Sequence, residues 1–337
     1  MSKILSITLV LVLLFSTDAI CQDKDDYKLV KTYHIASPGW WDYIAVNNNK
    51  LYVSHGTQVN ILDEKTGDSI GIIPNTDGVH GIAFDNELNH GYTSNGRANN
   101  VTVFDLTTNA IITQIVTGQN PDAIYYEPFS KKIITNNGRS NDLSVIDPLT
   151  NKVITTIDVG GKPEEAVSDG NGNLYVNIED KNQVVAVNLN TFKVENRWSI
   201  LPGEAPTGLA IDSKTKRLFA GCGDNKLLMV IDATNGKVVG KIPIGDGCDG
   251  VAFDKDKNLI FTSNGEGTIT VIKEKSANEF KVKQTIITKR GARTITIDQN
   301  THTLFLPTAD FEPLDSNAPK GTRPKMIAGS FQVLVVK

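Results

Sequence analysis

The sequence predicts an all-β fold: a seven-bladed β-propeller of four-stranded antiparallel blades. Two observations support this. A short apolar run ending in an acidic or amide residue occurs seven times, at intervals of 38 to 44 residues, and each unit contains strand-like runs separated by turn residues. The residues that end the runs are Asn47, Asp85, Glu127, Asp169, Asp212, Asp254 and Asp298. Four strands repeated at such a period are typical of a propeller blade.

Residues 1–21 are expected to be a secretory signal peptide. Lys3 precedes an uncharged apolar run at residues 4–15, and small or polar residues follow it. A helix of that length would reach only about 18 Å, which is too short to cross a bilayer. Cleavage after Ala19 and cleavage after Cys21 both fit; a lipid-modified Cys21 fits less well, because Ile20 is branched. We therefore expect a periplasmic or extracellular protein without a membrane span.

Residues 22–337 are expected to form a single propeller, with blades starting near residues 42, 80, 122, 164, 207, 249 and 293. One unit illustrates the pattern, with strand-like runs near residues 165–168, 174–177, 183–188 and 193–200. The Asp-x-x-Thr turns, such as the one that begins at Asp105, are interpreted as structural, because the carboxylate can accept backbone N–H groups. In the repeated TSNG segments, the Asn-Gly pair is expected to supply positive φ angles.

The last blade is expected to close the ring. Its own strands are predicted near residues 293–297, 303–306 and 331–336, and the unpaired run at residues 28–35 would add the fourth strand. Closure of this kind removes exposed sheet edges. Residues 307–330, between the strands predicted near residues 303–306 and 331–336, form a long loop that breaks the repeat. This loop is rich in Pro, Gly and charged residues. Such loops are often functional, and we expect this one to act as a lid, with Phe311, Arg323 and Met326 as contacts.

Composition limits the partners. The 34 basic and 38 acidic residues and a pI near 5.8 leave no basic field for a nucleic acid backbone, which makes nucleic acid an unlikely partner. The five histidines form no zinc or haem motif. After signal cleavage at Cys21, only Cys222 and Cys248 would remain. They could be disulfide-bonded or free, and the free state is favoured. A monomer is expected.

The repeats resemble those of YVTN-repeat β-propellers, in particular the secreted YncE-like proteins. The resemblance rests on the G-x-x-P-[DE]-x-[IV] segment at residues 118–124, the SNG turns, the V-x-V-[IF]-D-x-x-T strands and turns, and the V-x-x-x-I-x-[VI]-G segment at residues 153–160. Residues 306–336 are similar to the last blade of such proteins. The resemblance implies the propeller fold for nearly the whole mature chain. It leaves function open, since similar propellers include lactonases, lyases, electron-transfer subunits and non-catalytic binders, and nucleic-acid binding is suggested for some.

Seven equivalent residues are predicted at one mouth of the propeller, five positions before each run end. We call them the mouth ring: Asp42, His80, Asp122, Glu164, Thr207, Asp249 and Arg293. Crowded carboxylates attract cations or acquire raised pKa values. The alternative is a solvated rim whose charges pair with Arg293 or with lysines. Asp122 and Glu164, from adjacent blades, are the best candidate pair for a weak divalent cation, and no other cofactor is indicated.

Further ligand contacts are predicted around this ring. Arg97 and Arg139 occupy matching loops of adjacent blades and could clamp a carboxylate or phosphate, or could be ordinary turn cations. Trp40 and Trp41 could offer an indole, although at least one of them is expected to be packed, and Arg323 would reach the ring from the long loop.

Two functions follow from this candidate face. The favoured one is a non-catalytic module that binds a small molecule or a protein. The alternative is a metal-dependent enzyme of lactonase or lyase type, with Asp42, His80, Asp122, Glu164 and Asp249 as available metal ligands. The sequence assigns no catalytic residue.

Overall fold

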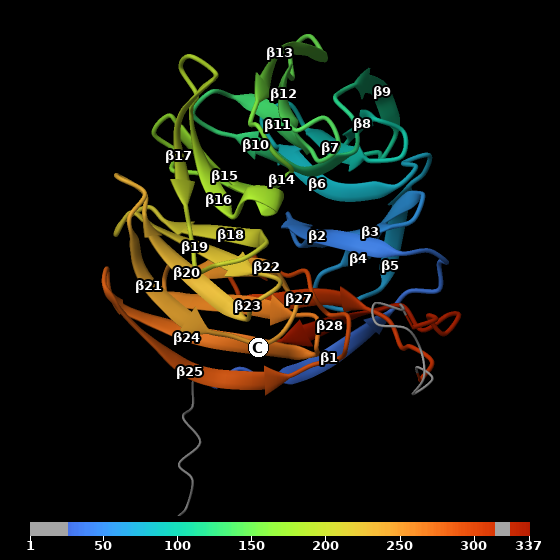
Figure 1. Cartoon of the computed structure of the whole chain (residues 1–337). Helices are drawn as coiled ribbons and strands as arrows, with labels where there is room; N and C mark the ends of the chain where they lie inside the picture. Colours follow the sequence, from blue (N-terminus) through green and yellow to red (C-terminus); the bar gives the residue numbers. More distant parts are fainter. Residues whose placement is uncertain (1–25, 314–323) are drawn as a thin grey trace, which may run out of the picture.

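The computed structural model describes residues 26–313 and 324–337; the expected signal peptide and Arg323 lie outside them. Seven four-stranded antiparallel sheets stand around a common axis (Figure 1), which confirms the predicted seven-bladed propeller. The only helical segment in the described part of the chain is the 3-10 turn η1 (Glu179–Lys181). Among these residues, no helix has the length and apolar character needed to span a membrane.

Six blades are continuous segments of chain, each running from its innermost to its outermost strand. The first three contain β2 (Trp41–Asn47), β3 (Lys50–His55), β4 (Gln58–Asp63) and β5 (Ser69–Ile73); β6 (Val79–Asp85), β7 (His90–Asn95), β8 (Asn100–Asp105) and β9 (Ile111–Val116); and β10 (Pro121–Glu127), β11 (Lys132–Asn137), β12 (Asp142–Asp147) and β13 (Lys152–Asp158). The next three contain β14 (Pro163–Ser168), β15 (Asn173–Ile178), β16 (Gln183–Asn188) and β17 (Lys193–Ser199); β18 (Pro206–Asp212), β19 (Arg217–Cys222), β20 (Leu227–Asp232) and β21 (Val238–Pro243); and β22 (Cys248–Asp254), β23 (Leu259–Asn264), β24 (Thr268–Ser276) and β25 (Glu279–Ile287).

The seventh blade joins the two ends of the described chain. It contains β26 (Thr296–Asp298), β27 (Thr303–Thr308), β28 (Gln332–Val336) and, as its outermost strand, β1 (Leu29–His34). β1 pairs with β28 in antiparallel register, with Thr32 opposite Leu334. The backbone groups of Lys28 and Lys337 exchange two further hydrogen bonds of 3.0 and 2.9 Å. The prediction that the N-terminal strand closes the ring is therefore confirmed.

The hydrophobic core lies between the blades. A large side chain at the third position of the second strand is buried in every blade and packs into one of the clusters that join adjacent sheets: Tyr52, Tyr92, Ile134, Tyr175, Phe219, Phe261 and Phe305. Truncating one such aromatic to alanine typically costs about 3–5 kcal/mol. These positions explain why each unit carries an aromatic or branched residue just before its polar turn.

The Asp-x-x-Thr turns are structural, as predicted. Asp105 Oδ1 accepts hydrogen bonds from the backbone N–H groups of Thr107 and Thr108, at 3.0 and 2.7 Å. The same arrangement recurs at Asp63. These carboxylates hold turns on the face away from the mouth ring and are not available as ligands.

The explanation expected for the Asn-Gly pairs is wrong. Positive φ occurs at Asn99, four residues after Asn95, and not at Gly96. Gly96 is required for space, because a Cβ there would come within 2.6 Å of His80 Nε2. Asn95 instead donates two side-chain hydrogen bonds across its own blade, to Asn100 and Thr102, each 2.8 Å long.

The two ends of the long loop at residues 307–330 lie beside the mouth. Phe311 and Met326 form an isolated antiparallel bridge, and Glu312 N–H donates to Lys325 O at 2.8 Å. The Phe311 ring lies 6.0 Å from that of Trp41. The described ends of this loop thus form one wall of the mouth, whereas the predicted lid contact of Arg323 lies outside the described residues.

Both cysteines in the described propeller are free and buried. Burial raises the pKa of both thiols. This resolves the alternatives left by the sequence in favour of two thiols, and the domain is held by its core and its ring closure.

We predict that deletion of residues 22–36 destabilises the whole domain. The deletion removes β1, exposes the edge of β28 and removes Tyr33 and Ile35 from the cluster between blades seven and one. The loss of two such side chains is expected to lower the melting temperature by about 10 °C or more. Circular dichroism melts would measure this, with Val30→Ser, an exposed position on β1, as the control. Equal melting of the truncated and full-length proteins would contradict the closure.

Candidate functional site

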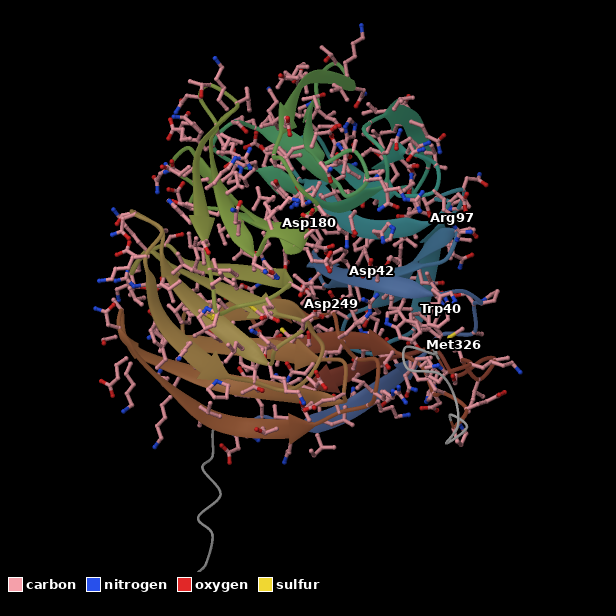
Figure 2. All side chains as sticks on the ribbon, in the orientation of Figure 1. Trp40, Asp42, Arg97, Asp180, Asp249 and Met326 are labelled. Carbon is pink, nitrogen blue, oxygen red and sulfur yellow. The ribbon has the colours of Figure 1, made fainter. Side chains whose placement is uncertain are left out.

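The mouth-ring residues share one place in the repeat. Asp42 is the second residue of β2, and the equivalent residues of blades two to six are likewise second in their innermost strands. In each of these blades the register with the second strand shifts around that position, for example between Trp41 and Ile44. Such irregularities redirect side chains at strand ends. The repeat therefore presents one variable side chain per blade near the axis, as Asp42 and Asp249 illustrate (Figure 2).

The backbone of the mouth ring is held by side chains of neighbouring blades. Ser94, in the SNG motif of blade two, donates a hydrogen bond to the carbonyl oxygen of Asp122. Asn177 of blade four donates to the carbonyl oxygen of Thr207 at 3.0 Å. The corresponding pairs are Asn136 with Glu164, and Ser263 with Arg293. In these four blades the Ser or Asn thus fixes the backbone of the next blade's mouth residue, whereas the equivalent Ser54 of blade one bonds within its own blade.

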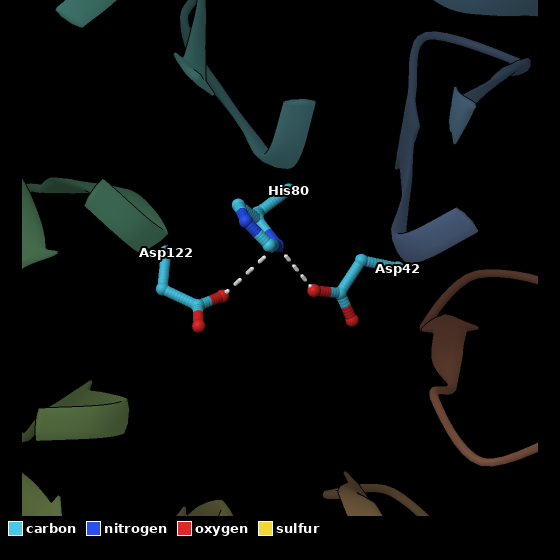
Figure 3. Close-up of side chains that lie close together, drawn as sticks. All are labelled: Asp42, His80 and Asp122. Carbon is cyan, nitrogen blue, oxygen red and sulfur yellow. Dashed lines mark hydrogen bonds and ion pairs between the residues drawn. The ribbon is translucent and has the colours of Figure 1, made fainter. Parts of the chain in front are cut away.

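Three mouth-ring side chains meet on one side of the axis (Figure 3). His80 Nδ1 lies 2.6 Å from Asp42 Oδ2 and 3.6 Å from Asp122 Oδ1. One oxygen or nitrogen from each residue falls within 4.8 Å of the others. The close group is therefore Asp42, His80 and Asp122, which shares only Asp122 with the Asp122–Glu164 pair predicted for a cation.

Arg293 links one further acid, Asp249, to this group. Its guanidinium forms an ion pair with Asp249, and its Nη2 lies 3.6 Å from Asp42 Oδ1. Thr207 supplies no charge, and its hydroxyl donates to the carbonyl oxygen of Cys248 at 2.7 Å. Arg293 therefore neutralises part of the acidic ring, as the solvated-rim alternative supposed.

Lys162 is a mouth residue that the sequence interpretation missed. Its ammonium group lies 2.6 Å from Glu164 Oε1 and also pairs with Glu179. Lys162 lies two residues before Glu164, so a count of five residues back from the run end does not reach it. Its position in the loop that enters blade four could have identified it. Glu165, also missed, accepts a hydrogen bond of 2.8 Å from Leu209 N–H, and burial raises its pKa to about 8.

The electrostatics of the three-residue group are asymmetric. Burial alone would lower the pKa of His80, but its hydrogen bond to Asp42 and the charges of Asp122 and Asp42 raise that pKa to about 9. Burial would raise the pKa of Asp42, but the bond from His80 and the charge of Arg293 hold it below its usual value. Burial raises the pKa of Asp122 to about 6, with repulsion from Asp42 and Asp249 opposing the attraction of His80. At neutral pH, His80 is a cation bonded to Asp42.

The mouth holds more acid than base. Asp42, Asp122, Glu164, Glu179 and Asp249 face the three cations His80, Lys162 and Arg293. Burial, with repulsion from neighbouring carboxylates, also raises the pKa values of Glu164 and Asp249. A carboxyl whose charged form is disfavoured in this way gains when another cation approaches.

An aromatic wall borders the charged group. Trp40 is 52% exposed, whereas Trp41 is 6% exposed and packs against Phe311 and Phe331. Trp40, Trp41 and Arg293 line two hollows of about 260 and 310 Å³. Phe311 and Arg290 lie along the first hollow, and Asp42, His80 and Arg97 along the second. The exposed indole is therefore that of Trp40, while the predicted Trp41 contributes only a mostly buried face.

The remaining predicted contacts are not equivalent. Arg97, labelled in Figure 2, lines the second hollow. Its Nε lies 3.6 Å from Asp77 Oδ1. Arg139 is exposed and does not line either hollow. The two arginines therefore do not share either hollow, and the clamp of Arg97 with Arg139 stays a prediction.

Comparisons with known proteins place this geometry in context. A family model described as YNCE-like beta-propeller matches residues 91–306. None of the curated protein sequences matches the chain. Among solved structures, hydrazine synthase from Kuenenia stuttgartiensis is similar, with a TM-score of 0.71 and 15% identity, over 81% of this chain and 94% of that one. At that identity the likeness shows the fold alone.

We predict that two substitutions in the close group change stability in opposite directions at pH 7.5. Asp122→Asn removes a carboxylate whose raised pKa makes its charge costly above pH 6, so the melting temperature should rise by about 2 °C. Asp42→Asn weakens the acceptor of His80 and should cost about 1–3 kcal/mol. Most of the gain for Asp122→Asn should be lost at pH 4.5, where Asp122 is protonated in the folded protein, and the rest should disappear below about pH 4, the ordinary pKa of an unfolded aspartate.

Thermal melts of both variants at the two pH values would measure these shifts. Equal destabilisation by both substitutions at pH 7.5 would show that the mouth carboxylates are simply structural, in contradiction to the charge imbalance described above.

Proposed function

The chain belongs to the YNCE-like β-propellers, and on that premise we propose that it is a non-catalytic module that binds a small organic ligand at the mouth ring. The proposed ligand carries an ammonium group or a similar N–H cation together with a flat or apolar part. The family provides the fold, and the chemistry of the mouth supports the ligand class.

One observation carries this proposal. Asp122 Oδ1 is buried and accepts no hydrogen bond from the described residues. His80 Nδ1, at 3.6 Å, is too far away for a hydrogen bond. A buried acceptor without a donor costs about 1–3 kcal/mol. A ligand N–H group beside Asp122 would recover this free energy.

The surroundings of Asp122 favour a cationic donor. At pH 7.5 four carboxylates face three cations at the mouth, because the pKa of Glu164 is raised to about 9 and this carboxyl group is protonated. An ammonium would balance the remaining negative charge, whereas a neutral donor would leave it. The exposed Trp40 indole, next to the hollow that contains Asp42 and His80, could cover the apolar part of the ligand and contact its cation. A lysine side chain of a partner protein offers the same chemistry.

We also propose that the protein acts in the periplasm or outside the cell. The support is the apolar run at residues 4–15 with its preceding lysine, which has the length and flanks of a signal peptide.

Amine binding is the first test. We expect 2-phenylethylamine to bind at least tenfold more tightly than 2-phenylethanol in calorimetry at pH 7.5. Asp122→Asn should weaken amine binding about tenfold, because it removes the charge of the acceptor, and Trp40→Ala should weaken both ligands. Asp246→Asn is the matched control, because it makes the same charge change at a carboxylate that pairs with Lys226 at 3.2 Å and does not belong to the close group. Equal affinity for the amine and the alcohol would overturn the proposed ligand class.

The pH dependence provides a separate prediction. Because the pKa of Asp122 is raised to about 6, the carboxylate forms as the pH rises from 5 to 7, and amine affinity should increase over that interval. The Asp122→Asn variant should lose most of this increase. Calorimetry at pH 5, 6 and 7 measures it, and a wild-type affinity that is flat or falls with pH would exclude Asp122 as the acceptor.

A metal-dependent enzyme is the second candidate function, of the lactonase or lyase type. The observation in its favour is the close approach of Asp42, His80 and Asp122, whose ligand atoms lie within 4.8 Å. Two carboxylates and a histidine can hold a divalent ion. A metal at His80 Nδ1 would have to displace a proton from a group whose pKa is about 9. The positive charge of Arg293, 3.6 Å from Asp42 Oδ1, would also repel the metal ion.

On this second reading, Mn²⁺ or Zn²⁺ added to chelator-treated protein should bind more tightly as the pH rises from 6 to 9. His80→Ala should abolish binding, and the metal-loaded protein should hydrolyse a simple lactone. Calorimetry and a lactone assay test both parts. Metal binding that is absent, or unaffected by His80→Ala, would remove this candidate.

A further inference from the structure

A lysine-rich hollow lies on blade six, on the outer strands and away from the mouth ring. Its volume is about 560 Å³, and five lysines line it: Lys257, Lys273, Lys275, Lys281 and Lys283. The protein as a whole carries a formal charge of −4, so this concentration of basic groups departs from its composition.

The hollow depends on a hairpin that breaks the repeat. β24 and β25 contain nine residues each, whereas the outermost two strands of the other continuous blades contain five to seven. Lys273 ends the segment equivalent to β12, where blade three has Asp147. Blade six thus exchanges a turn carboxylate for a lysine and extends the hairpin beyond it.

The hairpin places like charges directly opposite each other. Lys273 pairs in register with Lys281, whereas the equivalent pair in blade three is Asp147 with Lys152. Directly opposite like charges destabilise an antiparallel pair. A bound anion between the two ammonium groups would offset this repulsion.

Part of the hollow is already ordered. Lys273 Nζ donates to the carbonyl oxygen of Lys257 at 2.6 Å. Lys257 Nζ in turn donates to Tyr27 Oη at 3.3 Å and lies 4.9 Å from the centre of that ring. Glu279 and Asp26 pair with Lys275 and Lys283, at 2.7 and 3.8 Å. With Asp256 on the rim, three acids oppose the five lysines among the residues that the structure describes, so basic groups outnumber acidic ones there.

We propose that this hollow binds a linear anionic polysaccharide. Lysines two positions apart on one strand are separated by about 7 Å, and the facing strand lies about 5 Å away, which gives two rows of positive charge. A polymer with one anionic group on each sugar presents charges at comparable intervals. The lysine ammonium is a point charge with rotatable donors and accepts carboxylate or sulfate without a fixed geometry.

The lining of the hollow argues against two other polyanionic surfaces. Single-stranded nucleic acid is usually held by aromatic side chains that stack on its bases, but Tyr27 is buried, and none of the residues that line the hollow is aromatic. A lipid surface requires a larger exposed apolar face, and Val282 is the one exposed apolar residue in the lining, because Leu259 is buried.

The test uses fluorescently labelled heparin and polygalacturonate oligosaccharides in anisotropy titrations at low and moderate salt. Lys275→Gln/Lys281→Gln should bind at least fivefold more weakly than wild type, with a smaller dependence on salt. The matched control, Lys193→Gln/Lys241→Gln, changes the net charge equally at exposed positions on the outermost strands of blades four and five and should bind like wild type. Equal weakening by both pairs would overturn the proposal, since it would show a general charge effect.

A third variant separates binding from folding. Lys281→Glu creates an opposite-charge pair with Lys273, so its melting temperature should equal or exceed that of wild type, while oligosaccharide binding falls further than in the double variant. Binding of single-stranded DNA or anionic lipid vesicles more tightly than the oligosaccharides would assign the hollow to that partner instead. Failure of wild type to bind either oligosaccharide would also overturn the proposal, with no bearing on the mouth ring.

Discussion

In four of the seven blades, a side chain of the second strand donates a hydrogen bond to the mouth backbone of the next blade, and the arrangement of the mouth depends on this bond. In the SNG motif, Ser94 reaches the carbonyl oxygen of Asp122, and the equivalent Asn177 reaches that of Thr207. Because the acceptor is a carbonyl group, the bond fixes the backbone and leaves the mouth side chain unspecified. The ring can therefore vary one residue per blade without altering the packing between blades.

The mouth uses that freedom to accumulate charge that its own cations do not balance. His80 makes its shortest contact with Asp42, and Arg293 makes its shortest contact with Asp249. Each of these two cations is therefore committed mainly to one carboxylate. Asp122 is left with a buried oxygen without a donor. The unsatisfied oxygen of Asp122 destabilises the folded state, and the hydrophobic core between the blades compensates for this cost. A cationic ligand can pair with the carboxylates that the protein's own cations leave unpaired. A ring with every charge paired would not provide this interaction.

The sequence predicts the fold well because residues close together in the chain determine the turns and buried positions of each repeat. The Asp105 turn and the buried Tyr92 each follow from a few neighbouring residues. Counting back from the run ends reached the second residue of the innermost strand in blades one to six. Pairing within the ring could not be counted, because it depends on the angle between blades and on side-chain rotamers. Sequence spacing favoured Asp122 with Glu164, whereas Lys162 engages Glu164 and leaves Asp122 facing His80.

The two departures from the repeat lie where the propeller can accept them. The inner strands are constrained on both faces by neighbouring blades, whereas a loop in blade seven or an outer hairpin in blade six can lengthen toward solvent. Phe311, from the first departure, packs against Trp41 beside the exposed Trp40. Lys273 and Lys281, in the second, face each other at a cost that the other blades avoid. The regular parts of the sequence thus specify the fold, and the irregular parts mark the surfaces where binding is expected.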